Sequence, residues 1–291
     1  MSNNRFPVQG AGVGLRRALM GPLSSVSIDE VDFMEVAPEN WINVGGRYGK
    51  QFREYTERFP FICHGLSLSI GSPSPLDWEL IGQIKNFMKE HQIRYYTEHL
   101  TYCSDDAHLY DLMPIPFTEE AINYTVDRIC QIQDFLGQRI AMENASYYAA
   151  PQQEMSEINF INTVLEKADC GLLLDVNNIY VNSINHRYNA EEFLKQLPGE
   201  RVVYVHVAGH YVEAEDLRVD THGADVIDPV WQLLDKAYEH FGVMPTLLER
   251  DFNIPPVNEL LSEVNQIKQM QNDRMLSEPV CSGEAAGVNR L

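Results

Sequence analysis

The sequence lacks a Cys-x-x-Cys pair and any apolar run long enough to cross a membrane. Its five cysteines (63, 103, 130, 170 and 281) are odd in number and far apart, which argues against a disulfide framework. No apolar stretch approaches the roughly 18 residues of a membrane span. The first residues, MSNNRFPVQG, are polar and do not resemble a targeting segment. We therefore expect a cytoplasmic protein with reduced thiols and no membrane contact.

Basic residues are also scarce. The chain carries 22 Lys and Arg against 42 Asp and Glu, a net charge of −20. A surface that follows a phosphate backbone needs the opposite balance, so we expect no nucleic-acid partner. The excess of acid suits a protein that attracts cations or basic partners.

What the sequence does contain is a repeated alternation of short apolar runs and helical segments over 291 residues, of which 44% are apolar. The apolar runs that predict strands are 12–16, 31–36, 61–65, 93–98, 139–144, 171–175, 202–206 and 245–249. Most are separated by segments with helical periodicity, and this pattern is typical of a (β/α)8 TIM barrel, an α/β fold that fills this length as one domain. We expect the barrel to occupy residues 1–272. The composition of 273–291 predicts a disordered tail.

Nearly every predicted strand ends in a residue that is unfavourable to bury. These residues are Glu35, His64, His99, Glu143, Asp175, His206 and Glu249. The C-terminal ends of barrel strands converge on one face, where active sites form. Unpaired carboxylates would repel each other there, and bound cations are the natural compensation.

The stretch 201–223 concentrates the same chemistry. His206 ends an apolar strand, His210 follows, and Asp220 and His222 come after a short acidic loop. In extended chain, residues i and i+2 point to the same side, so Asp220 and His222 could bind one ion together. A mixed set of imidazole and carboxylate ligands suits Zn, Mn or Fe better than Ca. The alternative for each residue alone is a solvated or structural polar side chain.

Two further features lie outside the strands. Residues 104–117 are rich in proline and acids and predict a long loop, and long loops in compact domains are usually functional. Glu39 follows the second strand, either as an exposed loop acid or as part of the site.

Seven blocks of the sequence, in order, carry a resemblance to a known family. They are EVAPENW, HGLSLSIGS, EHLTY, MENASYY, LLLDVNNIYVN, VHVAGH and DTHG. Over roughly residues 8–270 the chain resembles the DUF692 (UPF0276) family, the multinuclear non-heme iron oxidative enzymes. That family is similar in fold to the xylose isomerase-like barrels, and its metal site resembles that of the apurinic endonuclease barrels.

The resemblance implies a set of metal ligands. Carried over block by block, these are His64, His99, Glu143, Asp175, Asn178, His206, Asp220, His222 and Glu249. Asn178 departs from the endonuclease pattern, which has a histidine there. A neutral amide oxygen is a weaker and harder ligand, so this position should prefer iron or manganese to zinc. Glu143 is the expected bridging ligand between two ions.

The resemblance also implies oxidative chemistry. Enzymes of the family use two or three irons, ferrous and ferric, and dioxygen to modify cysteine residues of ribosomally made precursor peptides, often with a small partner protein that presents the peptide. Several of the products handle copper. The expected residues for substrate contact or ligand support are His210, Asn177, Tyr180 and Asp251, with His210 as a proton carrier or a third-metal ligand.

Two other classes of function stay open at this stage. One is a zinc- or manganese-dependent hydrolase or sugar isomerase on the same barrel. The other is a binding module without catalysis, in which the polar strand ends are structural. The binding module predicts no stoichiometric iron, so metal analysis separates it from an iron enzyme.

Overall fold

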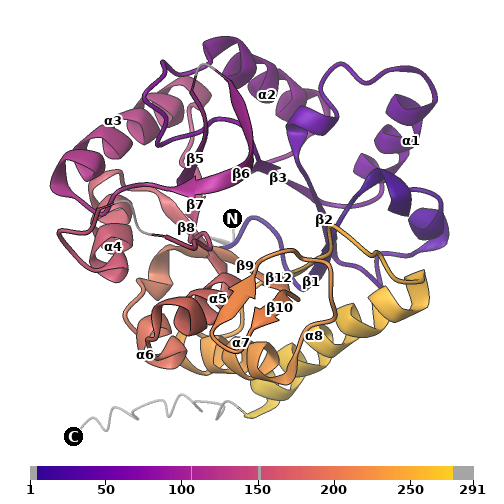
Figure 1. The fold of residues 1–291 in the computed structure, drawn as a ribbon. Coiled ribbons are helices and arrows are strands. Elements are labelled where there is room, and N and C mark those ends of the chain that lie inside the picture. The colour runs from indigo at the N-terminus through magenta and orange to yellow at the C-terminus, as the bar shows by residue number, and fades with distance from the viewer. Residues whose placement is uncertain (1–4, 106, 150–151, 278–291) are drawn as a thin grey trace, which may run out of the picture.

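Figure 1 shows the computed structural model of the chain, in which residues 5–105, 107–149 and 152–277 are described. Within these ranges, eight parallel strands close a barrel in the order β1-β12-β9-β8-β7-β4-β3-β2. They are β1 (Ala11–Gly14), β2 (Phe33–Val36), β3 (Phe61–Gly65), β4 (Tyr96–His99), β7 (Ala141–Glu143), β8 (Gly171–Asp175), β9 (Val202–Ala208) and β12 (Thr246–Glu249). The predicted TIM barrel is confirmed.

Helices surround the barrel (Figure 1). They are α1 (Gly46–Thr56), α2 (Trp78–Glu90), α3 (Glu119–Leu136), α4 (Glu157–Lys167), α5 (Val176–His186), α6 (Ala190–Leu194), α7 (Asp228–Phe241) and α8 (Val257–Ser277). The sequence pattern did not predict α1, which contains two glycines, or α5, which begins with Val-Asn-Asn directly after a strand. The end of α8 corrects the predicted tail, since the helix includes residues 273–277. The remainder of that tail lies outside the described residues.

Two antiparallel hairpins follow barrel strands. One pairs β5 (Thr101–Ser104) with β6 (His108–Pro114), and the other pairs β10 (Tyr211–Ala214) with β11 (Leu217–Val219). The first corrects the predicted loop at 104–117. β6 is an edge strand of a two-stranded sheet, where a missing N–H is tolerated, so Pro114 at its last position did not mark a break in the strand.

Alternation along the strands divides their side chains into two layers. A small cluster contains Phe33, Ile62, Leu173, Tyr204 and Leu247, one from each of five barrel strands, together with Val8. These side chains fill the barrel interior. The ring of Phe33 fits there because residue 12 of β1 is glycine; a Cβ at that position would lie only 2.6 Å from the Phe33 ring. Since side chains repeat every two residues, the residue two positions later on each strand also points inward.

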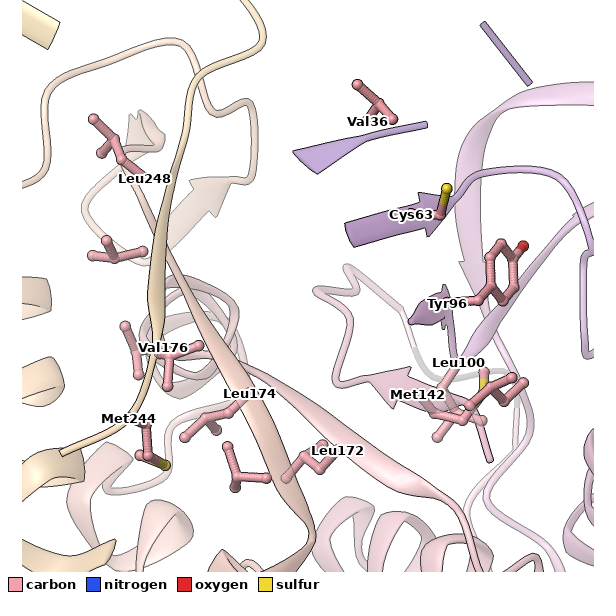
Figure 2. Close-up of a cluster of buried hydrophobic side chains, with 14 of the residues drawn as sticks. Val36, Cys63, Tyr96, Leu100, Met142, Leu172, Leu174, Val176, Met244 and Leu248 are labelled. Atoms are coloured by element: carbon pink, nitrogen blue, oxygen red, sulfur yellow. The ribbon is translucent and has the colours of Figure 1, made fainter. Parts of the chain in front are cut away.

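The alternate residues face the helices and form the larger core. Figure 2 shows part of this cluster, including Val36, Cys63, Tyr96, Met142 and Leu174. Cysteines 63, 103, 130 and 170 are unpaired, and Cys281 lies outside the described ranges. Among the helices that the structure describes, none is long and apolar enough to span a bilayer.

Candidate metal centre

The inward positions at the C-terminal ends of the strands open into a cavity of about 500 Å³. On five strands this position lies two residues beyond the apolar interior layer, at Glu35, His64, Asp175, His206 and Glu249. The predicted ligands that line the cavity are His64, His99, Glu143, Asn178, Asp220, His222 and Glu249. Asp175 and His206 are fully buried beside them. The fold therefore gathers into one site residues that are far apart in the sequence.

The first group of potential ligands is formed by His64, His99 and Glu143. The Nε2 atoms of His64 and His99 each lie 3.1 Å from Glu143 Oε2 and 3.2 Å from each other. The other ring nitrogen of each histidine is held from behind: His64 Nδ1 lies 2.8 Å from Thr97 Oγ1, and His99 Nδ1 lies 2.9 Å from the Gly65 carbonyl oxygen. Nδ1 contacts of this kind orient a histidine so that Nε2 can bind a metal.

Two further groups follow, and each shares one carboxylate with the group before it, Glu143 and Asp175 respectively. Glu143, Asp175 and His206 form one, and Asp175, His222 and Glu249 form the other; within each group, one potential ligand atom from every residue lies within 4.8 Å of the others. Glu143 places Oε1 3.6 Å from His206 Nδ1, while its Oε2 faces the first group. Shared carboxylates between adjacent groups are the arrangement that a multinuclear site requires.

Many of these buried atoms lie close to a charged group but make no hydrogen bond of good geometry within the described part of the chain. They include Glu143 Oε2, Asp175 Oδ2, Asn178 Oδ1, His206 Nδ1, His222 Nε2 and Glu249 Oε2. Buried polar groups normally have partners, because an unpaired one is destabilising by about 1–3 kcal/mol. Several unpaired oxygen and nitrogen atoms converging at one place fit metal ligation, and the donors are of the type that binds Fe, Mn or Zn.

The ionisation of the cluster reflects the crowding of charges. Burial alone would lower the pKa of His99, but Glu143 and Glu98 raise it to about 9. The pKa of Glu249 lies well below its ordinary value, because His222 and His206 outweigh the effect of burial. Burial, together with the charges of Glu143 and Asp220, raises the pKa of Asp175 well above its ordinary value. Divalent cations would relieve this repulsion.

Asp220 and His222 meet, but not in the way predicted. The stretch after β11 is not extended, since His222 has a φ of 48°. The turn brings His222 Nε2 to 2.7 Å from Asp220 Oδ1. Asp220 also accepts hydrogen bonds from Asn177 Nδ2 at 2.9 Å and Ser146 Oγ at 3.2 Å, so it is the most heavily hydrogen-bonded of the predicted ligands in this stretch.

Asn178 lies beside Glu143. Its Nδ2 contacts Glu143 Oε1 at 3.5 Å and donates to the Asn144 carbonyl at 3.2 Å, which leaves Oδ1 unpaired and buried. Its backbone N–H donates to Asp175 Oδ1 at 2.6 Å, so Asp175 caps helix α5 with one oxygen. The other carboxylate oxygen of Asp175, Oδ2, remains available to the two ligand groups that contain this residue.

The expected catalytic residues fall in different places. Asp251 lines the cavity, 3.3 Å from His222 Nδ1. His210, Asn177 and Tyr180 do not line it. His210 Nδ1 lies 2.8 Å from Asn177 Oδ1, and its ring packs against that of Tyr180 with centroids 5.3 Å apart. These three residues therefore lie behind Asp220 and support it through Asn177.

A profile of the family described as the RiPP precursor modification enzymes MbnB/TglH/ChrH matches residues 10–272. RiPPs are ribosomally made peptides that are modified after synthesis. The chain belongs to this family. A member from Alcanivorax borkumensis, named only as a UPF0276 protein, is 63% identical over 272 residues, which cover 90% of this chain and 91% of the relative.

Solved structures outside the MbnB/TglH/ChrH family share the fold. The 3-keto-D-glucoside 4-epimerase YcjR from E. coli is similar with a TM-score of 0.60 at 12% identity, covering 90% of this chain and 99% of the epimerase. Endonuclease IV from Thermus thermophilus is similar with a TM-score of 0.58 at 11% identity, and the match covers 91% of this chain and 99% of the endonuclease. At such identities the likeness concerns the barrel alone.

Sequence reasoning missed two charged residues of this MbnB/TglH/ChrH-type site, Arg16 and Asp111. Arg16 lines the cavity and donates from Nε to Asp251 Oδ1 at 2.6 Å and from NH2 to Glu249 Oε1 at 3.1 Å. Burial alone would lower its pKa, but Asp251, Glu249 and Glu35 raise it. The signal was present, since Arg16 lies two residues beyond Gly14 and so continues the inward alternation of β1.

Glu39 is neither an exposed loop acid nor a wall of the cavity. Its Oε1 accepts the N–H groups of Leu66 and Ser67 at 2.8 and 3.1 Å, directly after β3. Burial, with the nearby charge of Glu98, raises the pKa of Glu39 to about 7. It therefore fixes the loop that follows His64.

Proposed function

We propose that the chain is an iron-dependent enzyme that uses dioxygen to modify cysteine residues of a ribosomally made precursor peptide. The observation that carries the proposal is the convergence of three overlapping ligand groups, with unpaired buried atoms, at the active face of a barrel whose family modifies RiPP precursors. Two or three iron ions would be held by His64, His99, Glu143, Asp175, Asn178, His206, Asp220, His222 and Glu249. Bound iron would supply a Lewis acid for the cysteine thiolate and the electrons that reduce dioxygen.

The residues of the chain have separate tasks in this proposal. Glu143 would serve two ions, because its two oxygens face different groups of ligands. Arg16 offsets part of the negative charge and holds Glu249 and Asp251 in place. Asp251 reaches the cavity and is the best placed of the four expected catalytic residues to touch a substrate.

The opening of the cavity suits a peptide. Leu66, Leu109, Tyr148 and Phe252 all line it and are all exposed, and they come from four different segments of the barrel face. Exposed apolar side chains around a polar cavity are typical of a surface that binds another chain. A small partner protein that presents the peptide, a copper-handling product and a cytoplasmic location belong to the same proposal.

The second candidate is a zinc- or manganese-dependent hydrolase or sugar isomerase. It is favoured by the donor set itself, since imidazole and carboxylate groups also bind these metals. The metal content therefore decides between the two candidates.

The experiment is metal analysis with Mössbauer spectroscopy on protein purified anaerobically from iron-supplemented cells. The proposal predicts two or more irons per chain with coupled ferric and ferrous signals. Full occupancy by zinc or manganese, with iron unable to support any reaction, would favour the hydrolase or isomerase instead.

A further inference from the structure

A buried hydrogen-bond chain connects two of the candidate ligands, His64 and His206, through Glu35, which itself lines the cavity. Glu35 is fully buried on β2 and points inward. Its Oε2 accepts the hydroxyl of Tyr204 at 2.5 Å and lies 2.8 Å from His206 Nε2. On the other side, Tyr204 Oη lies 3.1 Å from Thr97 Oγ1, which lies 2.8 Å from His64 Nδ1.

The direction of each hydrogen bond follows from the carboxylate at the end, which can only accept. Tyr204 donates its hydroxyl proton to Glu35, so its oxygen is free to accept from Thr97. Thr97 in turn can accept the Nδ1 proton of His64, although the Cys63 carbonyl, 3.4 Å away, competes for the Thr97 hydroxyl proton. From the opposite side, His206 donates its Nε2 proton to the same Glu35 oxygen.

This arrangement fixes which ring nitrogen of each histidine carries the proton. A neutral imidazole has one N–H and one lone pair. With the proton on Nδ1, the lone pair of His64 lies on Nε2, which faces Glu143. With the proton on Nε2, the lone pair of His206 lies on Nδ1, 3.0 Å from Glu249 Oε2 and 3.6 Å from Glu143 Oε1.

We propose that Glu35 is a positioning residue that sets the tautomers of two metal ligands, His64 and His206, in different ligand groups. The inference rests on the proposed function in so far as that function requires a metal at these histidines. Contacts that orient a ligand from behind change metal affinity by about tenfold to a hundredfold when they are removed. Glu35 Oε1 is unpaired and buried, so a direct metal bond by Glu35 is the competing explanation that the experiment must separate.

The test uses zinc, a diamagnetic probe, with affinity measured by calorimetry and histidine tautomers measured by ¹⁵N NMR. Glu35→Leu should weaken zinc binding by tenfold or more and disturb both tautomers. Tyr204→Phe should disturb His64 and leave the Nε2 proton of His206 in place. Glu35→Gln should bind zinc with an affinity within about threefold of wild type, because the amide oxygen can still accept both hydrogen bonds. The amide nitrogen cannot bind zinc.

Tyr238→Phe is the matched control, since it removes another buried tyrosine hydroxyl, which contacts Thr246 outside the site. It should leave zinc affinity unchanged. Equal zinc binding and equal tautomers in wild type, Glu35→Leu and Tyr204→Phe would overturn the inference. Glu35→Gln as weak as Glu35→Leu would overturn it in favour of direct ligation. Failure of the wild type to bind any metal would instead overturn the proposed function on which the inference rests.

Discussion

At the scale of single residues, Glu143 is the side chain on which the candidate metal centre depends most. It is buried on β7, and its two oxygens face two different groups of ligands. Its pKa lies below the ordinary value, because His99 and His64 outweigh the effect of burial. It therefore presents two charged oxygens to the site at neutral pH.

Replacing Glu143 by glutamine should remove at least one metal ion per chain. One of the two ligand oxygens becomes an NH2 group, which cannot bind a metal, and the bridging charge is lost. Metal content is measured by inductively coupled plasma mass spectrometry, with Glu157→Gln as a control for loss of a buried carboxylate elsewhere. Equal metal content in Glu143→Gln and wild type would contradict the assignment.

Glu157 gives the protein a pH dependence that is independent of the cavity. It lies on α4, accepts hydrogen bonds from Tyr147 Oη and Asn182 Nδ2 at 3.1 Å each, and has its pKa raised to about 7 by burial. The folded pKa lies above the unfolded value of about 4.3, so the stability from this group is present below that value and is lost as the pH rises to about 7. The full effect is on the order of 3 kcal/mol.

As the pH rises from 5.5 to 8, the free energy of unfolding of wild type should therefore fall relative to that of Glu157→Gln. Urea unfolding at the two pH values measures the difference, and groups that are common to both proteins cancel in the comparison. An equal change in the free energy of unfolding of the two proteins between these pH values would show that Glu157 ionises normally in the folded state.

At the scale of elements, the strands determine which residues meet. An apolar inward residue and a polar one two positions later recur as Phe33 and Glu35, Ile62 and His64, and Tyr204 and His206. This period of two was readable in the sequence, so the polar strand ends could be predicted to converge. The partners of each polar atom could not, because they depend on the three-dimensional closure of the barrel. Glu35 is the example: the sequence marked it as unusual without revealing that His206 and Tyr204 share its oxygen.

The hairpins and α5 show where local signals fail. Prolines and acids between 104 and 117 hid the alternation of β6, whose Leu109 and Asp111 line the cavity. The polar start of α5 hid a helix that is capped by the Asp175 carboxylate, which accepts the N–H of Asn178. In each case one of the side chains that obscured the pattern, Asp111 or Asn178, lines the candidate site, where function competes with regular patterning.

The N-terminus of α3 is capped by a side chain. Thr118 is its N-cap and accepts the N–H of Ala121 at 3.2 Å. Thr118→Ala should lower the free energy of unfolding by about 1–2 kcal/mol, because it leaves that N–H without a partner. Thr163→Ala, within α4, is the control and should be neutral or slightly stabilising, since alanine favours the helix interior. A urea midpoint for Thr118→Ala equal to that of wild type would contradict the cap.

At the scale of the whole molecule, the barrel brings carboxylates from separate strands together in a chain that already carries a net charge of −20. Removal of bound metal should therefore lower the melting temperature by several degrees, because the remaining carboxylates repel each other and ligand binding stabilises the folded state. Differential scanning fluorimetry with and without a chelator measures the change, and added metal should restore it. An unchanged melting temperature after complete metal removal would argue against a centre built from these strand ends.

The most direct test of the account is a crystal structure of iron-loaded protein with anomalous diffraction measured on both sides of the iron absorption edge. The account predicts two or more iron peaks, one between His64, His99 and Glu143 and one against Asp175, His206 or His222, with Glu143 between neighbouring ions. The account would be contradicted if iron-loaded crystals gave no anomalous peak at these strand ends. It would also be contradicted if the peaks persisted below the iron edge, because they would then come from a different metal.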